Sequence, residues 1–138
     1  MKIHTVILAA GEGSRMQSNK AKSLQPVGGL SMLRRIFDTV SNLTDETSFV
    51  VGFEKDSVIN EVEKFSGINY ICEQKKPIGT ADAVKSALDS IKQNSKVLVL
   101  YGDVPLIKNE TLNNLISMTD DSLTILSTEL KNPTGYGR

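Results

Sequence analysis

Apolar runs and stripes of apolar residues at helical spacing alternate along the chain. The runs at 3–9, 49–51, 68–72 and 97–101 are rich in β-branched or aromatic residues, which is typical of strands. The last of these runs is uninterrupted, and this predicts a strand that is covered on both faces. Residues 122–130 are predicted to form a fifth strand.

Four helices are predicted between these strands. Residues 31–42 place their apolar side chains on a single helical stripe. Asp56 is a residue type that caps helices, so it is expected to begin the second helix. The third helix carries an apolar face from Ala81 to Ile91, and Asn109 is expected to cap the fourth.

Strands that alternate with helices indicate crossover connections and a mainly parallel sheet. Right-handed crossovers place helices on both faces of that sheet. The predicted fold is therefore α/β, a Rossmann-like doubly wound sheet in which the first and fourth strands can be neighbours. Ligands bind such sheets beyond the carboxyl ends of the strands, where the loops 10–29, 73–79 and 102–108 are expected to project.

Composition and charge limit the classes of partner. The 138 residues fit one domain, and 16 basic residues balance 16 acidic ones, so no basic field exists to gather nucleic acid. Cys72 is the only cysteine, and this favours a reducing compartment. The amino-terminal apolar run is too short for a membrane span and lacks a signal-peptide pattern. We therefore expect a cytoplasmic location without membrane or nucleic-acid partners. His4 is interpreted as a strand-edge residue rather than a base.

A glycine-rich loop at 9–16 follows the first strand. Small residues let the backbone turn sharply, and consecutive N–H groups can then cradle phosphate oxygens. Arg15, Lys20 and Lys22 supply charge that a nucleoside triphosphate needs. The loop lacks the lysine of a Walker A motif, and Met16 stands where a dinucleotide fingerprint needs glycine. The residues alone leave phosphate binding and a plain strand-to-helix loop both open.

Two further loops carry polar side chains suited to a nucleotide. Asp103 follows the fourth strand and offers a hard oxygen to Mg²⁺, although aspartate at this position is also a common turn residue. Gln74 can both donate and accept hydrogen bonds, as the edge of uracil requires. Plain alternatives are that Gln74 is solvated and that Thr80 caps the third helix.

These loops carry motifs that resemble those of the nucleotide-sugar pyrophosphorylase family. LAAGEGSRM at 8–16, with KSL at 22–24 and two glycines at 28–29, resembles the family's phosphate-binding signature. YGDVPL at 101–106 resembles its metal-binding motif. The glutamine, glycine and threonine spacing in the second loop, and NPTGYGR at 132–138, resemble the uridylyltransferases that act on N-acetylglucosamine-1-phosphate.

The resemblance implies roles for particular residues. Arg15 would hold the triphosphate, Lys22 would neutralise charge as pyrophosphate leaves, and Asp103 would bind Mg²⁺. Gln74 would donate its amide to uracil. Glu12 and Ala21 depart from the common family pattern, and Glu12 is expected to point outward. The substrate-binding set implied by the resemblance is Leu8, Ala9, Ala10, Gly11, Lys22, Gln74, Gly79, Thr80, Tyr101, Gly102, Asp103 and Gly137.

The reaction implied is transfer of a uridylyl group from UTP to N-acetylglucosamine-1-phosphate. Two alternatives remain open: a related enzyme with another base, such as a molybdopterin guanylyltransferase, and a non-catalytic nucleotide-binding regulatory module. Residues 1–138 would be the N-terminal portion of a truncated nucleotidylyltransferase domain of poor activity. Bifunctional bacterial members of the family continue into a trimeric acetyltransferase β-helix. We therefore expect a homo-oligomer, with self-association of this chain through the unpaired edge of 122–130.

Overall fold

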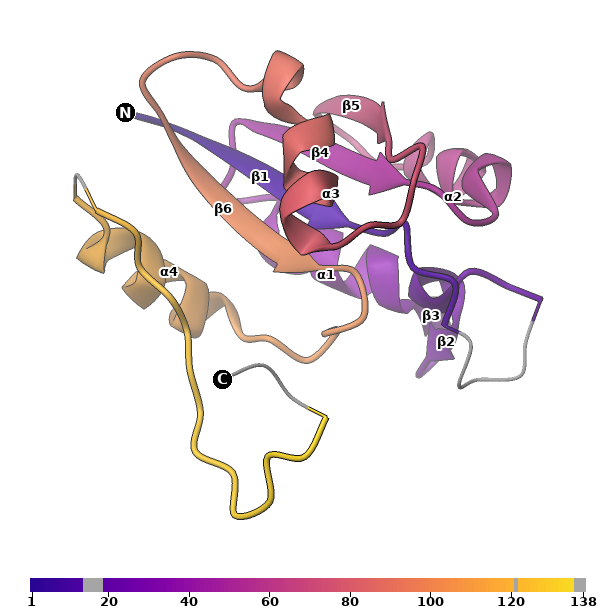
Figure 1. Ribbon diagram of the computed structural model, residues 1–138. Coiled ribbons are helices and arrows are strands. Elements are labelled where there is room, and N and C mark those ends of the chain that lie inside the picture. Colours follow the sequence, from indigo (N-terminus) through magenta and orange to yellow (C-terminus); the bar gives the residue numbers. More distant parts are fainter. Residues whose placement is uncertain (14–18, 121, 136–138) are drawn as a thin grey trace.

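The computed structural model describes residues 1–13, 19–120 and 122–135. Its centre is a four-stranded sheet in the order β5-β4-β1-β6 (Figure 1). The strands are β1 (Lys2–Leu8), β4 (Glu46–Val51), β5 (Ile68–Glu73) and β6 (Ser95–Tyr101), and every pair is parallel. Strand order reverses between β1 and β6, so the expected neighbours do meet at the switch point of the sheet.

Helices cover both faces of this sheet. Figure 1 shows α3 (Thr80–Ser86) in front of the sheet and α1 (Met32–Val40) behind it. Helices α2 (Lys55–Val62) and α4 (Asn109–Met118) contribute to the same core as α1. Because strand side chains alternate between faces, Ile7 packs into that core and Val6 into the core under α3. The predicted doubly wound α/β fold is confirmed.

Helix α1 forms as its apolar stripe predicts. Its four buried residues are Leu33, Ile36, Phe37 and Val40. The Ser31 side chain caps the helix by accepting a hydrogen bond from the Arg34 backbone N–H at 3.0 Å. Burying each large apolar side chain contributes about 1.5–3 kcal/mol, so the stripe fixes how this helix lies on the sheet.

The starts of α2 and α4 differ from the prediction. Glu54 adopts a left-handed conformation (φ 52°) and takes the cap position of α2, so Asp56 lies inside the first turn. Lys108 takes the cap position of α4. The Asn109 amide instead donates to the Thr39 carbonyl of α1 at 3.0 Å. This tertiary contact uses the side chain that was expected to cap α4.

The third predicted helix is broken before its expected end. Helix α3 stops at Ser86, and a 3₁₀ turn, η3 (Leu88–Ser90), follows. The Ser90 hydroxyl donates to the Ala87 carbonyl at 2.6 Å, which competes with helical hydrogen bonding. Leu88 is therefore 54% exposed and does not extend the apolar face.

Two predictions about strands are wrong. Strand β6 is an edge strand in which Leu98 and Leu100 are buried while Val97 and Val99 are exposed, so one face is open. Residues 122–130 form no strand, and in Figure 1 this yellow segment follows α4 without joining the sheet. Strand propensity is realised only where a neighbouring strand supplies hydrogen-bond partners, and this segment has no such neighbour among the described residues.

Among the described residues, no helix combines the length and apolar character needed to span a bilayer.

Candidate functional site

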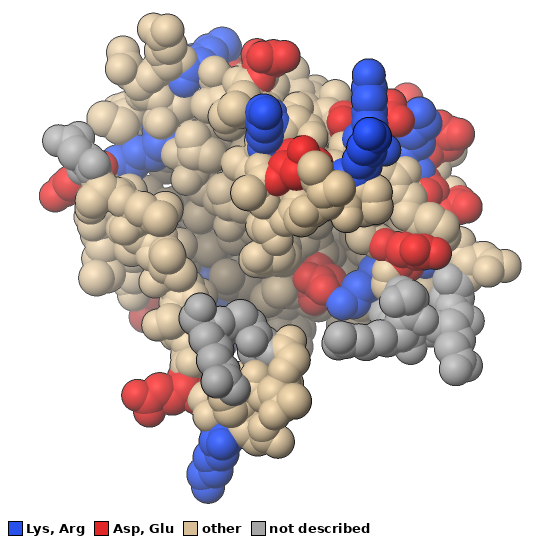
Figure 2. Space-filling view, in the orientation of Figure 1, with Lys and Arg blue, Asp and Glu red and all other residues tan. Residues whose placement is uncertain are grey.

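A cavity of about 580 Å³ opens at the carboxyl edge of the sheet, where the three predicted loops meet. Arg15 and Gly137 lie outside the described residues. All other residues of the predicted site line this cavity: Leu8, Ala9, Ala10, Gly11, Lys22, Gln74, Gly79, Thr80, Tyr101, Gly102 and Asp103. On the face seen in Figure 2, basic and acidic side chains are interspersed without a continuous patch of either sign.

Gly102 brings the end of β6 against the end of β1. Its backbone N–H donates to the Leu8 carbonyl at 2.8 Å. A Cβ atom at this position would lie 2.7 Å from the same oxygen and 3.3 Å from the Ala9 Cα. Only glycine permits this approach, which places Asp103 beside the loop that follows β1.

Lys22 and Asp103 form an ion pair on the wall of the cavity. The Lys22 Nζ lies 2.5 Å from the Asp103 Oδ2, and both side chains are partly exposed. Lys22 begins a 3₁₀ turn, η2 (Lys22–Leu24), within the region expected to be loop. Gly13 has a φ of 66°, and a Cβ there would lie 2.7 Å from the Lys22 Cβ, so the glycine-rich loop closes directly over the lysine.

A small hairpin spans the end of the predicted loop 10–29 and the two residues that follow it. Strands β2 (Pro26–Val27) and β3 (Leu30–Ser31) pair antiparallel immediately before α1. The Arg35 guanidinium of α1 holds this hairpin by donating to the carbonyls of Val27 and Gly28. The hairpin therefore ties the end of this loop region to α1.

The Gln74 amide is engaged within its own loop. Its Nε2 donates to the Gly79 carbonyl at 3.1 Å and to the Asp82 Oδ2 at 3.0 Å. The amide nitrogen that was expected to donate to a base carbonyl therefore makes two contacts within the protein. Gly79 takes the cap position of α3 with a φ of 132°, so Thr80 is the first helical residue rather than the cap.

Sequence reasoning missed two residues around the cavity and misplaced a third. Asp82 reaches Gln74 only because the β5–α3 loop folds back, which no local pattern signals. Ser23 lines the cavity with a buried hydroxyl that has no hydrogen-bond partner among the described residues. The position of Ser23 directly after Lys22 in the sequence could have indicated that it belongs to the site. Glu12, expected to point outward, is exposed but also lines the cavity.

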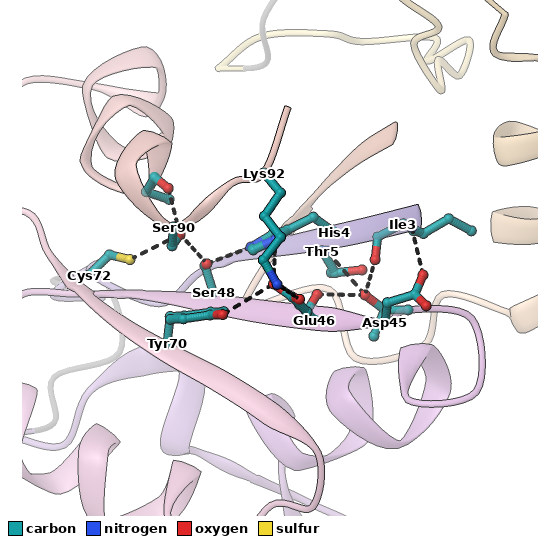
Figure 3. Close-up of polar contacts among 12 residues, drawn as sticks. Ile3, His4, Thr5, Asp45, Glu46, Ser48, Tyr70, Cys72, Ser90 and Lys92 are labelled. Atoms are coloured by element: carbon teal, nitrogen blue, oxygen red, sulfur yellow. Dashed lines mark hydrogen bonds and ion pairs between the residues drawn. The ribbon is translucent and has the colours of Figure 1, made fainter. Parts of the chain in front are cut away.

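A buried polar network lies toward the amino ends of β1 and β4, away from the cavity (Figure 3). His4 is only 2% exposed in a central strand rather than at an edge, and its Nε2 lies 2.7 Å from the Ser48 Oγ. Glu46 accepts hydrogen bonds from Lys92 and from the Tyr70 hydroxyl. Ser48 is fully buried, so this serine, histidine and glutamate arrangement cannot meet a substrate and serves the fold.

Charge and burial set the pKa values in this network. Burial lowers the pKa of His4, an effect partly opposed by the nearby Glu46 carboxylate. The hydrogen bond from Lys92 lowers the pKa of Glu46, and the same contact raises the pKa of Lys92. We infer a neutral His4 beside an ionised Glu46 near neutral pH.

The residues at the cavity suit a divalent cation only in part. The described residues contain no cluster of three or more histidine, cysteine, aspartate or glutamate side chains that could hold a metal. Mg²⁺, however, commonly takes one or two carboxylates and completes its shell with phosphate oxygens and water. Asp103 fits such an incomplete shell, because it is a partly exposed carboxylate on the cavity wall.

The fold is shared by proteins of known structure. The chain superposes on 4-diphosphocytidyl-2C-methyl-D-erythritol synthase from Anaerococcus prevotii with a TM-score of 0.67 and 26% identity, covering 84% of this chain and 49% of that one. It also superposes on the manganese complex of Rv0371C from Mycobacterium tuberculosis with a TM-score of 0.66 and 19% identity, covering 85% and 59% of the two chains.

Sequence comparison identifies the family. A model described as the MobA-like NTP transferase domain matches residues 5–136, and the chain belongs to this family. It is 47% identical to "Bifunctional protein GlmU" of Ruthia magnifica subsp. Calyptogena magnifica over 99% of its own length, which confirms the resemblance to the bifunctional bacterial enzymes. The chain spans 30% of the length of that relative.

Proposed function

We propose that this chain is the N-terminal, nucleotide-binding portion of a uridylyltransferase domain. The reaction would transfer a uridylyl group from UTP to N-acetylglucosamine-1-phosphate, giving UDP-N-acetylglucosamine and pyrophosphate. Family membership and the relative named as bifunctional GlmU support nucleotidyl transfer. The observation that carries the proposal is the Lys22–Asp103 pair, held under a glycine-rich loop at the switch point of the sheet.

The chemistry needs positioning and charge neutralisation rather than a protein nucleophile. A phosphate oxygen of the sugar-1-phosphate attacks the α-phosphorus of UTP, and the bond from that phosphorus to the β-phosphate bridging oxygen breaks. Pyrophosphate leaves with the electron pair. Lys22 lies on the cavity wall, where its ammonium group would stabilise the charge that develops on the departing pyrophosphate.

Gly11 and Asp103 would both serve the phosphates. No described protein atom lies within 4 Å of where a Cβ of Gly11 would stand, so a phosphate can approach its backbone closely. Asp103 would hold Mg²⁺, which would neutralise phosphate charge when bound. Arg15, outside the described residues, is assigned to the triphosphate by resemblance alone.

The ion pair between Lys22 and Asp103 must open for both groups to act. In the structure each neutralises the other across 2.5 Å. A pair this exposed contributes on the order of 1 kcal/mol or less, so a triphosphate and a cation together can replace it easily. In the free site the charges of Lys22 and Asp103 thereby offset each other until both ligands arrive.

The remaining residues of the predicted site would hold the nucleoside and sugar. Gln74 and Gly79 would face the base, and Thr80 and Gly137 would lie toward the sugar. Leu8, Ala9, Ala10, Tyr101 and Gly102 would form the floor between them. The match to a MobA-like family model keeps guanylyl transfer as the second candidate.

A thermal-shift panel tests this proposal on the purified chain. UTP, GTP, CTP and UDP-N-acetylglucosamine are each added with Mg²⁺, because a ligand that binds only the folded state raises the melting temperature. We expect UTP and UDP-N-acetylglucosamine to raise it most. A larger shift with GTP would favour the guanylyltransferase, and no shift with any nucleotide would contradict the proposal. Nucleotide-dependent stabilisation without turnover in the longer protein would favour a regulatory module.

A further inference from the structure

The orientation of the Gln74 amide is fixed by its two partners. Its Nε2 faces the Gly79 carbonyl and the Asp82 carboxylate, and both of these groups only accept hydrogen bonds. Turning the amide over would place its oxygen against two other oxygens. The assignment of nitrogen and oxygen therefore follows from the network itself rather than from the shape of the side chain.

This orientation decides which atom Gln74 can offer to a ligand. An amide nitrogen carries two hydrogens, and two acceptors within the protein already use them. Within the described part of the chain, no group donates a hydrogen bond to the Oε1. Gln74 lines the cavity, so its remaining polar atom is an acceptor.

We propose that Asp82 is a positioning residue for base selection, which it performs by locking Gln74 so that this side chain presents an acceptor to the nucleobase. This inference rests on the proposed function. An acceptor pairs with a ring N–H group, which uracil has at N3 and guanine at N1. Cytosine and adenine carry an unprotonated nitrogen at the equivalent place, so two acceptors would face each other. The lock thus selects against cytosine and adenine.

Asp82 is well placed to hold the lock. It lies in the first turn of α3 and is partly buried, and a carboxylate accepts a stronger hydrogen bond than a neutral group does. The backbone of Gln74 is also held, since its N–H donates to the Val51 carbonyl at 2.8 Å. With backbone and side chain both fixed before the ligand arrives, little ordering cost remains at binding.

The test compares nucleotides on one protein sample, so that any loss of folded fraction cancels. Calorimetry with Mg²⁺ measures the binding of UTP, CTP and 3-methyl-UTP, which lacks the N3 hydrogen, to the complete chain and to Asp82→Asn. The asparagine keeps the shape but can face Gln74 with either its oxygen or its nitrogen. We expect the wild-type chain to prefer UTP over both other nucleotides, and Asp82→Asn to lower the UTP to CTP affinity ratio on the order of tenfold.

Two further variants separate positioning from a general charge effect. Asp56→Asn removes a carboxylate from the first turn of another helix, α2, where Asp56 is exposed, and it should leave the ratio unchanged. Asp82→Glu restores an acceptor-only group and should recover part of the preference. An unchanged ratio in Asp82→Asn, with UTP still bound, overturns the inference but leaves the proposed function intact. Failure of the wild-type chain to bind any uridine nucleotide overturns the proposed function and this inference with it.

Discussion

At the scale of single residues, the Lys22–Asp103 pair joins two loops that lie 81 positions apart in sequence. The sequence predicted both residues, each on its own loop, because glycines and a strand end marked their surroundings. It could not predict that they pair with each other, since that depends on β6 lying directly beside β1. Asp82 escaped prediction for the same reason, because its partner becomes a neighbour only after the loop folds.

Removing the charge of Asp103 should change the role of Mg²⁺ more than it changes the fold. In Asp103→Asn, Lys22 loses its competing partner, so UTP without metal should bind a few-fold more tightly than to the wild-type chain. The additional affinity that Mg²⁺ provides should largely disappear. Calorimetric titrations with and without Mg²⁺ measure both quantities. If Mg²⁺ increased the affinity for UTP as much in Asp103→Asn as in the wild-type chain, Asp103 would be only a turn residue.

Gly102 should tolerate no side chain. A Cβ would press against the Leu8 carbonyl, a backbone atom that cannot move without shifting β1. We expect Gly102→Ala to lose about 1–3 kcal/mol in the free energy of unfolding, as is typical of overpacking. Urea denaturation measures the loss. Gly11→Ala is the matched control, because its Cβ meets no described atom within 4 Å; an equal loss there would contradict this account.

At the scale of elements, the sequence predicted best where burial alone decides the structure. The stripe of α1 and the run of β1 are buried and formed close to where they were expected, whereas β4 contains the predicted residues 49–51 but begins three residues earlier, at Glu46. Predictions of strands and helices failed where a contact with another part of the chain decides the structure. The segment 122–130 has the composition of a strand, but no neighbouring strand pairs with it among the described residues. Helix α3 ends just before the backbone carbonyl that accepts a hydrogen bond from the Ser90 hydroxyl.

The network joining β1, β4 and the segment after α3 should make stability depend on pH. Burial lowers the pKa of His4 in the folded chain. As pH falls below about 6.5, His4 therefore becomes protonated in the unfolded chain before it does in the folded chain. Stability should therefore decrease as the pH falls from there toward the lowered pKa of His4. The lowered pKa of Glu46 adds a second loss at more acidic pH, below the ordinary glutamate value and through its folded pKa.

Urea denaturation between pH 7.5 and 5.5 tests the histidine contribution separately. We expect His4→Gln, which can still reach Ser48 with a polar atom but does not titrate, to flatten this part of the profile. Glu46 stays ionised in that range, so its own loss does not interfere. A wild-type profile that is already flat would contradict the assignment of a neutral, buried His4.

At the scale of the whole molecule, β6 is an edge strand of the sheet, and one face of this strand is exposed. Val97, Val99 and Tyr101 are exposed on this strand, and Leu123 and Ile125 are exposed on the segment that follows α4. A second cavity of about 780 Å³ lies between the strand and that segment. Exposed apolar surface beside an unpaired strand edge promotes association between chains.

We therefore predict that the purified chain self-associates through β6. Sedimentation velocity should give an average mass that rises with concentration above the 15.1 kDa of one chain. Val99→Lys should suppress the association, because a charge on an edge strand opposes edge-to-edge pairing. Ile68→Lys places the same charge on β5, the opposite edge, and should have little effect. A concentration-independent mass of 15.1 kDa would contradict the prediction.

The central claim is that the cavity at the carboxyl edge of the sheet binds a uridine nucleotide. Titration of the ¹⁵N-labelled chain with UTP and Mg²⁺, followed by amide NMR spectra, tests it most directly. The account predicts saturable shifts of the Gly11, Gly79 and Gly102 amides, which line the cavity, and no shift of Gly67, which precedes β5 at the other end of the sheet. Unmoved cavity glycines at saturating UTP, or shifts centred on Gly67, would contradict it.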